Sequence, residues 1–326
     1  MRLIEMHDYI ICDAGGTKAQ FILFSSMGIP KAVFRSSGAN ALLADQETSL
    51  AVVESGIREC LRSSGSALSD ITAIVLFIPG FSACLPRLKE SLGFQEIHVL
   101  SDHLNAFYGA LGKGVGITIL SGTGSFATGK DRKGNQATVG GWGPLIGDYG
   151  SGYHIGLLSL SHLTRLADEG NTGSILESLV LQQLHFTSTE QLRRGLYQPG
   201  ISRATIANLS CAVGDAAREQ DAAAIHILQT AADHLADLAV MVAKRIDSHG
   251  LSIALTGGVS NLGNLIHLPL GLAIAARLPQ CTYIPSIHSP AIGAVLYVLD
   301  VWEGCDIESG AIVQNIKTIQ EILPSC

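Results

Sequence analysis

Short apolar runs separated by glycine turns open the chain, and helical periodicity follows them. Residues 9–38 contain three such runs, which predicts three consecutive strands. Leu50, Val53 and Ile57 recur at helical spacing, which predicts a helix over residues 46–63. The alternation of helix and strand continues at residues 71–78, 85–92, 97–100 and 103–111. The first 112 residues therefore predict three strands followed by helix, strand, helix, strand and helix.

The same pattern then starts again. Apolar runs at residues 116–120, 126–130 and 136–139 predict three more strands. The helices expected after them lie near residues 151–167, 173–185, 203–218, 222–248, 262–277 and 291–301, with strands at 252–255 and 282–284. Repetition at this scale predicts a duplicated α/β fold. We expect one domain at 1–112 and a second, with helical insertions, at 113–312, and a tail helix at 313–324 is a candidate to pack on the first.

Composition narrows the class of protein. The chain has 326 residues, of which 47% are hydrophobic and 15% charged, as in a globular protein with well-filled cores. A net charge of −7 without a run of Lys or Arg argues against nucleic acid or an anionic membrane as partner. No signal peptide or membrane-spanning run is recognisable. The seven cysteines are scattered without a C-x-x-C pair, so we expect reduced thiols and a cytoplasmic location.

Three glycine turns follow predicted strands. The first, DAGGTK at residues 13–18, places Asp13 at a strand end, and SGTGS at 121–125 and TGGVSN at 256–261 are the other two. Glycine lets the backbone approach a ligand closely, and consecutive N–H groups can bind phosphate. Each turn alone also fits an ordinary hairpin or strand end. Together, in a duplicated pattern, they predict nucleotide binding.

These motifs, with GGWG at residues 140–143 and GDYGSG at 147–152, resemble a known superfamily. The chain is similar to the N-acetylglucosamine kinases and the BadF/BadG/BcrA/BcrD-type ATPases, within the actin/hexokinase/Hsp70 superfamily. The match runs in order over nearly the whole chain. It implies two ribonuclease H-like domains, each a mixed sheet flanked by helices, with ATP in the cleft between them.

The resemblance also implies roles for individual residues. Asp13 would hold Mg²⁺ directly or through water, and Thr17 and Thr123 would contact the phosphates of ATP. The full set implied for ATP is Asp13, Gly15, Gly16, Thr17, Lys18, Gly122, Thr123, Gly124, Ala217, Gly257 and Gly258. The set implied for an amino sugar is Asn40, Asp102, Ser125, Phe126, Gly141, Trp142, Gly143 and Asp148.

The resemblance favours Asp102 as the catalytic base, and the chemistry agrees, because a sugar hydroxyl loses its proton as the new bond to phosphorus forms. The alternative role for Asp102 is the N-cap of the helix that follows it. Asp148 is expected to accept hydrogen bonds from sugar hydroxyls, or else to form an Asx turn. Trp142 would line the sugar pocket, or fill a core.

The expected function is transfer of the γ-phosphoryl group of ATP to the 6-hydroxyl of N-acetylglucosamine, glucosamine or N-acetylmuramic acid, and the family implies a homodimer. Tyr149 stands where relatives usually carry Glu, which leaves the choice among these sugars open. One alternative is an ATPase activator of a radical dehydratase with an iron–sulfur cluster, for which Cys60 and Cys84 are the available ligands. The others are a non-catalytic sugar sensor and a sugar-responsive repressor, although no DNA-binding domain is evident.

Overall fold

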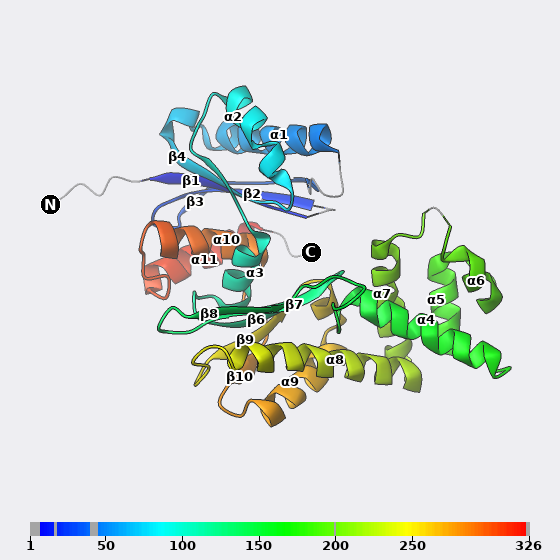
Figure 1. Ribbon diagram of the computed structural model, residues 1–326. Helices are drawn as coiled ribbons and strands as arrows, with labels where there is room; N and C mark the ends of the chain where they lie inside the picture. The colour runs from blue at the N-terminus through cyan, green and yellow to red at the C-terminus, as the bar shows by residue number, and fades with distance from the viewer. Residues whose placement is uncertain (1–6, 16–17, 40–44, 199, 324–326) are drawn as a thin grey trace. The chain divides into compact units, whose positions relative to one another are not determined.

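The chain divides into two units, which are described separately. A computed structural model describes residues 7–15, 18–39, 45–198 and 200–323 (Figure 1). Unit 1 consists of residues 1–114 and 287–326, and unit 2 of residues 115–286. The repeat pattern instead assigns residues 287–312 to the second domain. The difference arises because the helix in this segment packs on the first sheet.

Unit 1 is built on a mixed sheet with the strand order β3-β2-β1-β4-β5. β1 is antiparallel to β2, and β2 to β3, whereas β4 and β5 run parallel to β1. The carboxyl ends of β1, β4 and β5 therefore meet at one edge of the sheet. The bounds are β1 (Asp8–Ala14), β2 (Lys18–Ser25), β3 (Pro30–Ser37), β4 (Ile71–Phe77) and β5 (Ile97–Leu100).

Helices cover both faces of this sheet (Figure 1). Ile10 and Cys12 of β1 belong to the core that α1 (Gln46–Ser64) closes. Ile11 and Asp13 alternate with them, so their side chains lie on the opposite face, which α10 (Pro290–Tyr297) covers. A strand buried on both faces explains the continuous apolar run in the sequence.

Three more helices complete unit 1. α2 (Leu85–Leu92) joins β4 to β5, and α3 (Asp102–Leu111) follows β5. A π-helical segment, Val298–Trp302, continues α10, and α11 (Gly310–Ile322) ends the described chain. α11 contacts β3 and α10, and the Asn315 amide donates to the Met27 carbonyl oxygen over 2.8 Å.

The crossing of α3 and α10 is unusually close because glycines line it. A Cβ atom on Gly293 of α10 would collide with the carbonyl oxygen of Asn105 and the backbone of Gly109, both on α3. A Cβ atom on Gly109 would lie 2.6 Å from the carbonyl oxygen of Ser289. The two backbones are therefore in direct contact, with no side chain between them.

Unit 2 repeats the topology of unit 1. Its strand order is β10-β9-β6-β7-β8, so β6 to β8 correspond to β1 to β3, and β9 and β10 to β4 and β5. β6 pairs antiparallel with β7 and parallel with β9. The bounds are β6 (Gly116–Ser121), β7 (Ser125–Lys130), β8 (Gln136–Gly140), β9 (Ser252–Thr256) and β10 (Thr282–Ile284).

The helices of unit 2 form a layer on the sheet and an insertion beside it. α8 (Ala222–Ala243) packs on β6, β7 and β8, and α9 (Asn264–Arg277) packs on α8 and β10. The insertion consists of α4 (Gly152–Asp168), α5 (Ile175–Leu184), α6 (Leu192–Gly195) and α7 (Arg203–Arg218). It extends beyond one end of the sheet (Figure 1). Among all the described helices, none combines the length and the apolar character needed to cross a bilayer.

The glycine-lined crossing generates a stability prediction. Gly293→Ala places a methyl group against the α3 backbone, which cannot yield, so we expect it to lower the free energy of unfolding by about 1–3 kcal/mol. Gly310→Ala is the control, because a Cβ atom there meets nothing within 4 Å. Urea denaturation of both variants measures the difference. Equal midpoints for the two variants would show that the crossing tolerates a side chain.

Candidate functional site

Unit 1 brings two carboxylates to the edge where its parallel strands end. Asp13 lies near the end of β1, and Asp102 follows β5 as the first residue of α3. The Nδ2 atom of Asn105, one turn further along α3, donates to Oδ1 of Asp13 over 2.8 Å. Asn105 is fully buried, and its Oδ1 atom has no hydrogen-bond partner among the described residues. Sequence reasoning did not identify Asn105, which reads as an ordinary helical residue.

The environment of Asp13 is unfavourable for its charge. Burial raises the pKa of Asp13 to about 6, and the nearby carboxylate of Asp102 adds to the effect. The Asn105 amide and the Lys18 ammonium act in the opposite direction and lower this pKa, but they do not offset burial. The site therefore presents a partly buried carboxylate that would gain from a bound cation.

Asp102 is available for chemistry because it is not the helix cap. The N-cap of α3 is Ser101, whose hydroxyl accepts the N–H of His103 over 3.3 Å, so the alternative role considered for Asp102 is wrong. The Asp102 side chain is 41% exposed, and its Oδ1 atom lies 3.6 Å from Nε2 of His103.

The first glycine turn is only partly described. The Gly15 N–H donates to the Lys18 carbonyl oxygen over 3.0 Å, and the Ala39 N–H donates to the Gly15 carbonyl oxygen over 3.1 Å. Gly16, Thr17 and Asn40 lie outside the described residues.

In unit 2, the turn at residues 121–125 is bound to the turn at residues 148–152. The Ser121 hydroxyl donates to the Gly150 carbonyl oxygen over 2.9 Å, and the Ser125 hydroxyl to that of Tyr149 over 2.7 Å. The Gly152 N–H donates to the Gly122 carbonyl oxygen over 2.8 Å. Thr123 is exposed at the tip. Two of the predicted motifs are thus one structural element.

Asp148 is buried in this element and already has partners. Its φ angle of 58° is in the left-handed region, and it is 5% exposed. Its carboxylate accepts the N–H of Ser125 over 3.3 Å and forms an ion pair with Arg203, the first residue of α7. Sequence reasoning missed Arg203, because it lies in a helical insertion far from any motif.

The third turn lies against the first one in unit 2. A Cβ atom on Gly257, whose φ angle is 97°, would lie 2.5 Å from the Ser121 carbonyl oxygen, so only glycine fits there. His267 of α9 holds the other side of this turn: its Nε2 atom lies 3.1 Å from the Ser260 carbonyl oxygen and its Nδ1 atom 2.6 Å from the Tyr283 hydroxyl. Gly258 is exposed at the turn.

The remaining predicted residues differ in exposure. Phe126 and Ala217 are buried, at 8% and 1%, so the Ala217 side chain is part of the core. Gly141 and Gly143 have φ angles of 72° and 86° on either side of Trp142, which is 73% exposed and so does not fill a core. The core alternative for Trp142 is therefore wrong, and its contact with the sugar stays a prediction.

A cluster of three rings adjoins Asp148. The rings of Tyr149, His154 and His234 lie with their centroids 5.2–5.4 Å apart. Nδ1 of His154 accepts the Gly150 N–H over 3.2 Å. Burial, helped by the charge of His234, lowers the pKa of His154 to about 4. Tyr149 itself is 52% exposed.

The iron–sulfur alternative depends on Cys60 and Cys84. Cys60 and Cys84 are both buried in unit 1. Burial raises the pKa of Cys60 to about 12 and raises that of Cys84, which disfavours the thiolate that metals bind. Among the described residues, no group of three or more His, Cys, Asp and Glu side chains is arranged to hold a metal ion. The raised pKa values of Cys60 and Cys84 thus do not favour the iron–sulfur alternative.

The low pKa of His154 predicts a dependence of stability on pH. Below pH 6.5 the unfolded chain binds a proton that the folded protein excludes until about pH 4, so stability falls as the pH decreases through this range. His154→Asn retains an acceptor for the Gly150 N–H but does not titrate. We expect the wild type to lose up to about 2 kcal/mol more than this variant between pH 7 and pH 5.

Thermal or urea unfolding at several pH values measures this loss. His226→Asn, at an exposed position of α8, is the control and should follow the wild type. Parallel stability curves for wild type and His154→Asn would contradict the assignment.

Comparison with known proteins identifies the family of this chain. The BadF/BadG/BcrA/BcrD ATPase family matches residues 12–298. An N-acetylmuramic acid/N-acetylglucosamine kinase of Clostridium acetobutylicum is 29% identical over 298 residues, covering 88% of this chain and 97% of the relative. An N-acetyl-D-glucosamine kinase of Dictyostelium discoideum is 29% identical over 314 residues, covering 90% and 98%.

Solved structures agree on the fold. A protein of Chromobacterium violaceum, proposed as an N-acetylglucosamine kinase, superposes with a TM-score of 0.68 at 24% identity, covering 90% of this chain and 99% of that one. A glucokinase of the ROK family from Streptomyces griseus gives a TM-score of 0.59 at 17% identity, covering 89% and 97%. The prediction of a duplicated fold with two mixed sheets flanked by helices is confirmed.

Proposed function

Because the chain belongs to the BadF/BadG/BcrA/BcrD ATPase family, we propose that it is an ATP-dependent amino-sugar kinase. It transfers the γ-phosphoryl group of ATP to the 6-hydroxyl of N-acetylglucosamine or a close relative. The two curated relatives are both kinases of such sugars, and each matches over nearly its whole length. The observation that carries the proposal is the pair of carboxylates, Asp13 and Asp102, at one edge of the unit 1 sheet.

Asp102 is proposed as the base. Its half-exposed carboxylate accepts the proton of the sugar hydroxyl while the hydroxyl oxygen bonds to the γ-phosphorus. The bond from that phosphorus to the oxygen bridging to the β-phosphate breaks at the same time, and ADP leaves. Asp102 needs no cap function to explain its position, because Ser101 caps the helix.

Asp13 is proposed to bind Mg²⁺, directly or through water. The donor set fits, because Mg²⁺ in kinases is held by one or two carboxylates together with phosphate oxygens. The raised pKa of Asp13 indicates that the Asn105 amide and the Lys18 ammonium do not offset the cost of its charge, and the Oδ1 atom of Asn105 accepts no hydrogen bond from the described residues. When bound, Mg²⁺ neutralises charge on the transferring phosphate.

The turns of unit 2 are proposed to bind the nucleotide. The Gly122 N–H donates to the Gly124 carbonyl oxygen over 2.9 Å and shapes the turn, so the N–H groups that suit phosphate are those of Thr123 and Gly124. The side-chain-free surface at Gly257 and Gly258 suits adenine. Gly15, Lys18 and Thr17 have the same proposed role in unit 1. The sugar contacts proposed from the family remain Asn40, Ser125, Phe126, Gly141, Trp142, Gly143 and Asp148.

Three finer expectations belong to the same proposal. The scattered cysteines support a cytoplasmic protein, since those the structure describes are all unpaired. The homodimer rests on the family resemblance alone. The negative net charge supports small molecules, rather than nucleic acid or membrane, as partners.

ADP release with a panel of hexoses tests the function. With ATP and Mg²⁺ we expect turnover of at least one 2-amino or 2-acetamido sugar, because both curated relatives act on such sugars. Chelation of Mg²⁺ by EDTA should abolish turnover, and added Mg²⁺ should restore it. A preference for glucose over every amino sugar would overturn the assigned substrate. Sugar binding without any turnover would instead favour the non-catalytic sensor.

Substitution of the base tests the mechanism. Asp102→Asn keeps the size of the side chain but cannot accept the proton, so we expect turnover to fall by about 10² or more while the sugar still binds. Asp168→Asn, an exposed position at the end of α4, is the matched control and should keep wild-type turnover. Turnover and sugar affinity are measured separately. Near-normal turnover of Asp102→Asn would remove Asp102 from the mechanism.

A further inference from the structure

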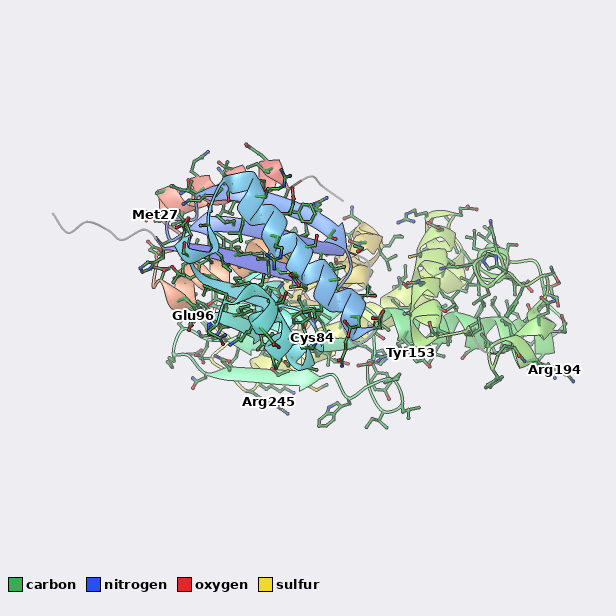
Figure 2. The ribbon with its side chains drawn as sticks, turned by 90° about the horizontal axis from the view of Figure 1, so that it is seen from above. Met27, Cys84, Glu96, Tyr153, Arg194 and Arg245 are labelled. Atoms are coloured by element: carbon green, nitrogen blue, oxygen red, sulfur yellow. The ribbon has the colours of Figure 1, made fainter. Side chains whose placement is uncertain are left out.

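Arg203 is a charged residue beside the phosphate turn that no motif assigns. It opens α7, where the Ser202 hydroxyl caps the helix by accepting the N–H of Thr205 over 3.1 Å. Its guanidinium therefore extends from the helix start rather than from the middle of a solvated face. Figure 2 shows Tyr153 where the helical insertion leaves the sheet and Arg194 at its far end. Arg203 contacts the Tyr153 ring, so it lies at the near end.

Three contacts fix the guanidinium in place. Its Nη2 atom pairs with Oδ2 of Asp148 and lies 3.5 Å from the Thr123 carbonyl oxygen. Its Cζ atom lies 5.8 Å from the centroid of the Tyr153 ring. The polar contacts all use Nη2, which leaves Nε and Nη1 without a partner among the described residues. Both atoms are donors in the planar geometry that phosphate oxygens accept in pairs.

Burial differs sharply between the two members of the ion pair. The Asp148 side chain is 4% exposed and the Arg203 side chain 42% exposed. The carboxylate thus acts as a buried anchor, and the accessible group is the cation. Gly124 makes room for the pair, because a Cβ atom there would lie 2.8 Å from both Nη2 of Arg203 and Oδ2 of Asp148.

We propose that Arg203 contacts the γ-phosphate of ATP and stabilises the charge on it during transfer. This role of Arg203 rests on the proposed function, in which the turn at residues 122–124 is the phosphate site. A cation held beside that turn lowers the cost of the negative charge on the transferring group. In the same arrangement, the ion pair with Asp148 positions the arginine.

The experiment compares ATP with ADP, which lacks the γ-phosphate. Binding of each nucleotide with Mg²⁺ to the full chain is measured by calorimetry for wild type, Arg203→Gln and Arg203→Lys. We expect the ratio of ATP to ADP affinity to fall about 10-fold or more in Arg203→Gln, the loss typical of a charge-assisted hydrogen bond. Arg203→Lys should recover part of this ratio and part of kcat. The ratio is taken within each variant, so a variant that is only partly folded does not distort it.

Controls separate this role from a structural one. Arg194→Gln, at an exposed position on α6, should leave the ratio and kcat unchanged. If Arg203 only braced Asp148, Arg203→Gln would weaken ATP and ADP equally, and that result would overturn the inference. If the wild type bound neither nucleotide, the proposed function would fail first, and this inference with it.

Discussion

The acidic edge of unit 1 depends on the direct backbone contact between α3 and α10. Glycines at positions 109 and 293 bring these helices together, and α10 in turn packs on β1. This arrangement fixes α3 over the carboxyl end of β1, where the Asn105 amide reaches Asp13. A side chain between the helices would move Asn105 and Asp102 together, because both belong to α3. The position of Asp102 relative to Asp13, which lies on β1, therefore depends on a contact that contains no side chain.

In unit 2, the polar turns of the candidate site are held in place by hydrogen bonds instead of close helix packing. Its two polar turns are joined by the hydroxyls of Ser121 and Ser125, and the third turn is pressed against Ser121 by a glycine in the left-handed region. The His267 side chain braces that third turn from α9 through the Ser260 carbonyl oxygen. Small hydroxyls and glycines leave the outer side of the turns as bare backbone, which suits a ligand recognised by N–H groups.

The sequence predicts this organisation well where the signal is local. Glycine turns after apolar runs identified the strand ends, and the repeat of the whole pattern identified the duplication, because both depend on short stretches of chain. The placement of α10 in unit 1 depends on packing between segments far apart in sequence, so the predicted domain boundary differs from the structural one. Asn105 and Arg203 were missed for the same reason. Asn105 binds Asp13 and Arg203 binds Asp148, and each partner lies many residues away in the sequence.

Asp148 of unit 2 and Asp13 of unit 1 differ in how the charge of the carboxylate is balanced. Asp148 has an arginine in contact, as a buried charge requires. Asp13 has a neutral amide in contact, and the effect of Lys18 is too small to offset burial, so its pKa lies near 6. A protein that needed Asp13 only for structure would be more stable with a cation paired to it, as at Asp148, or with an apolar residue in its place. An unbalanced carboxylate is instead what a site for a dissociable cation requires, because a resident cation would compete with the one that arrives with the nucleotide.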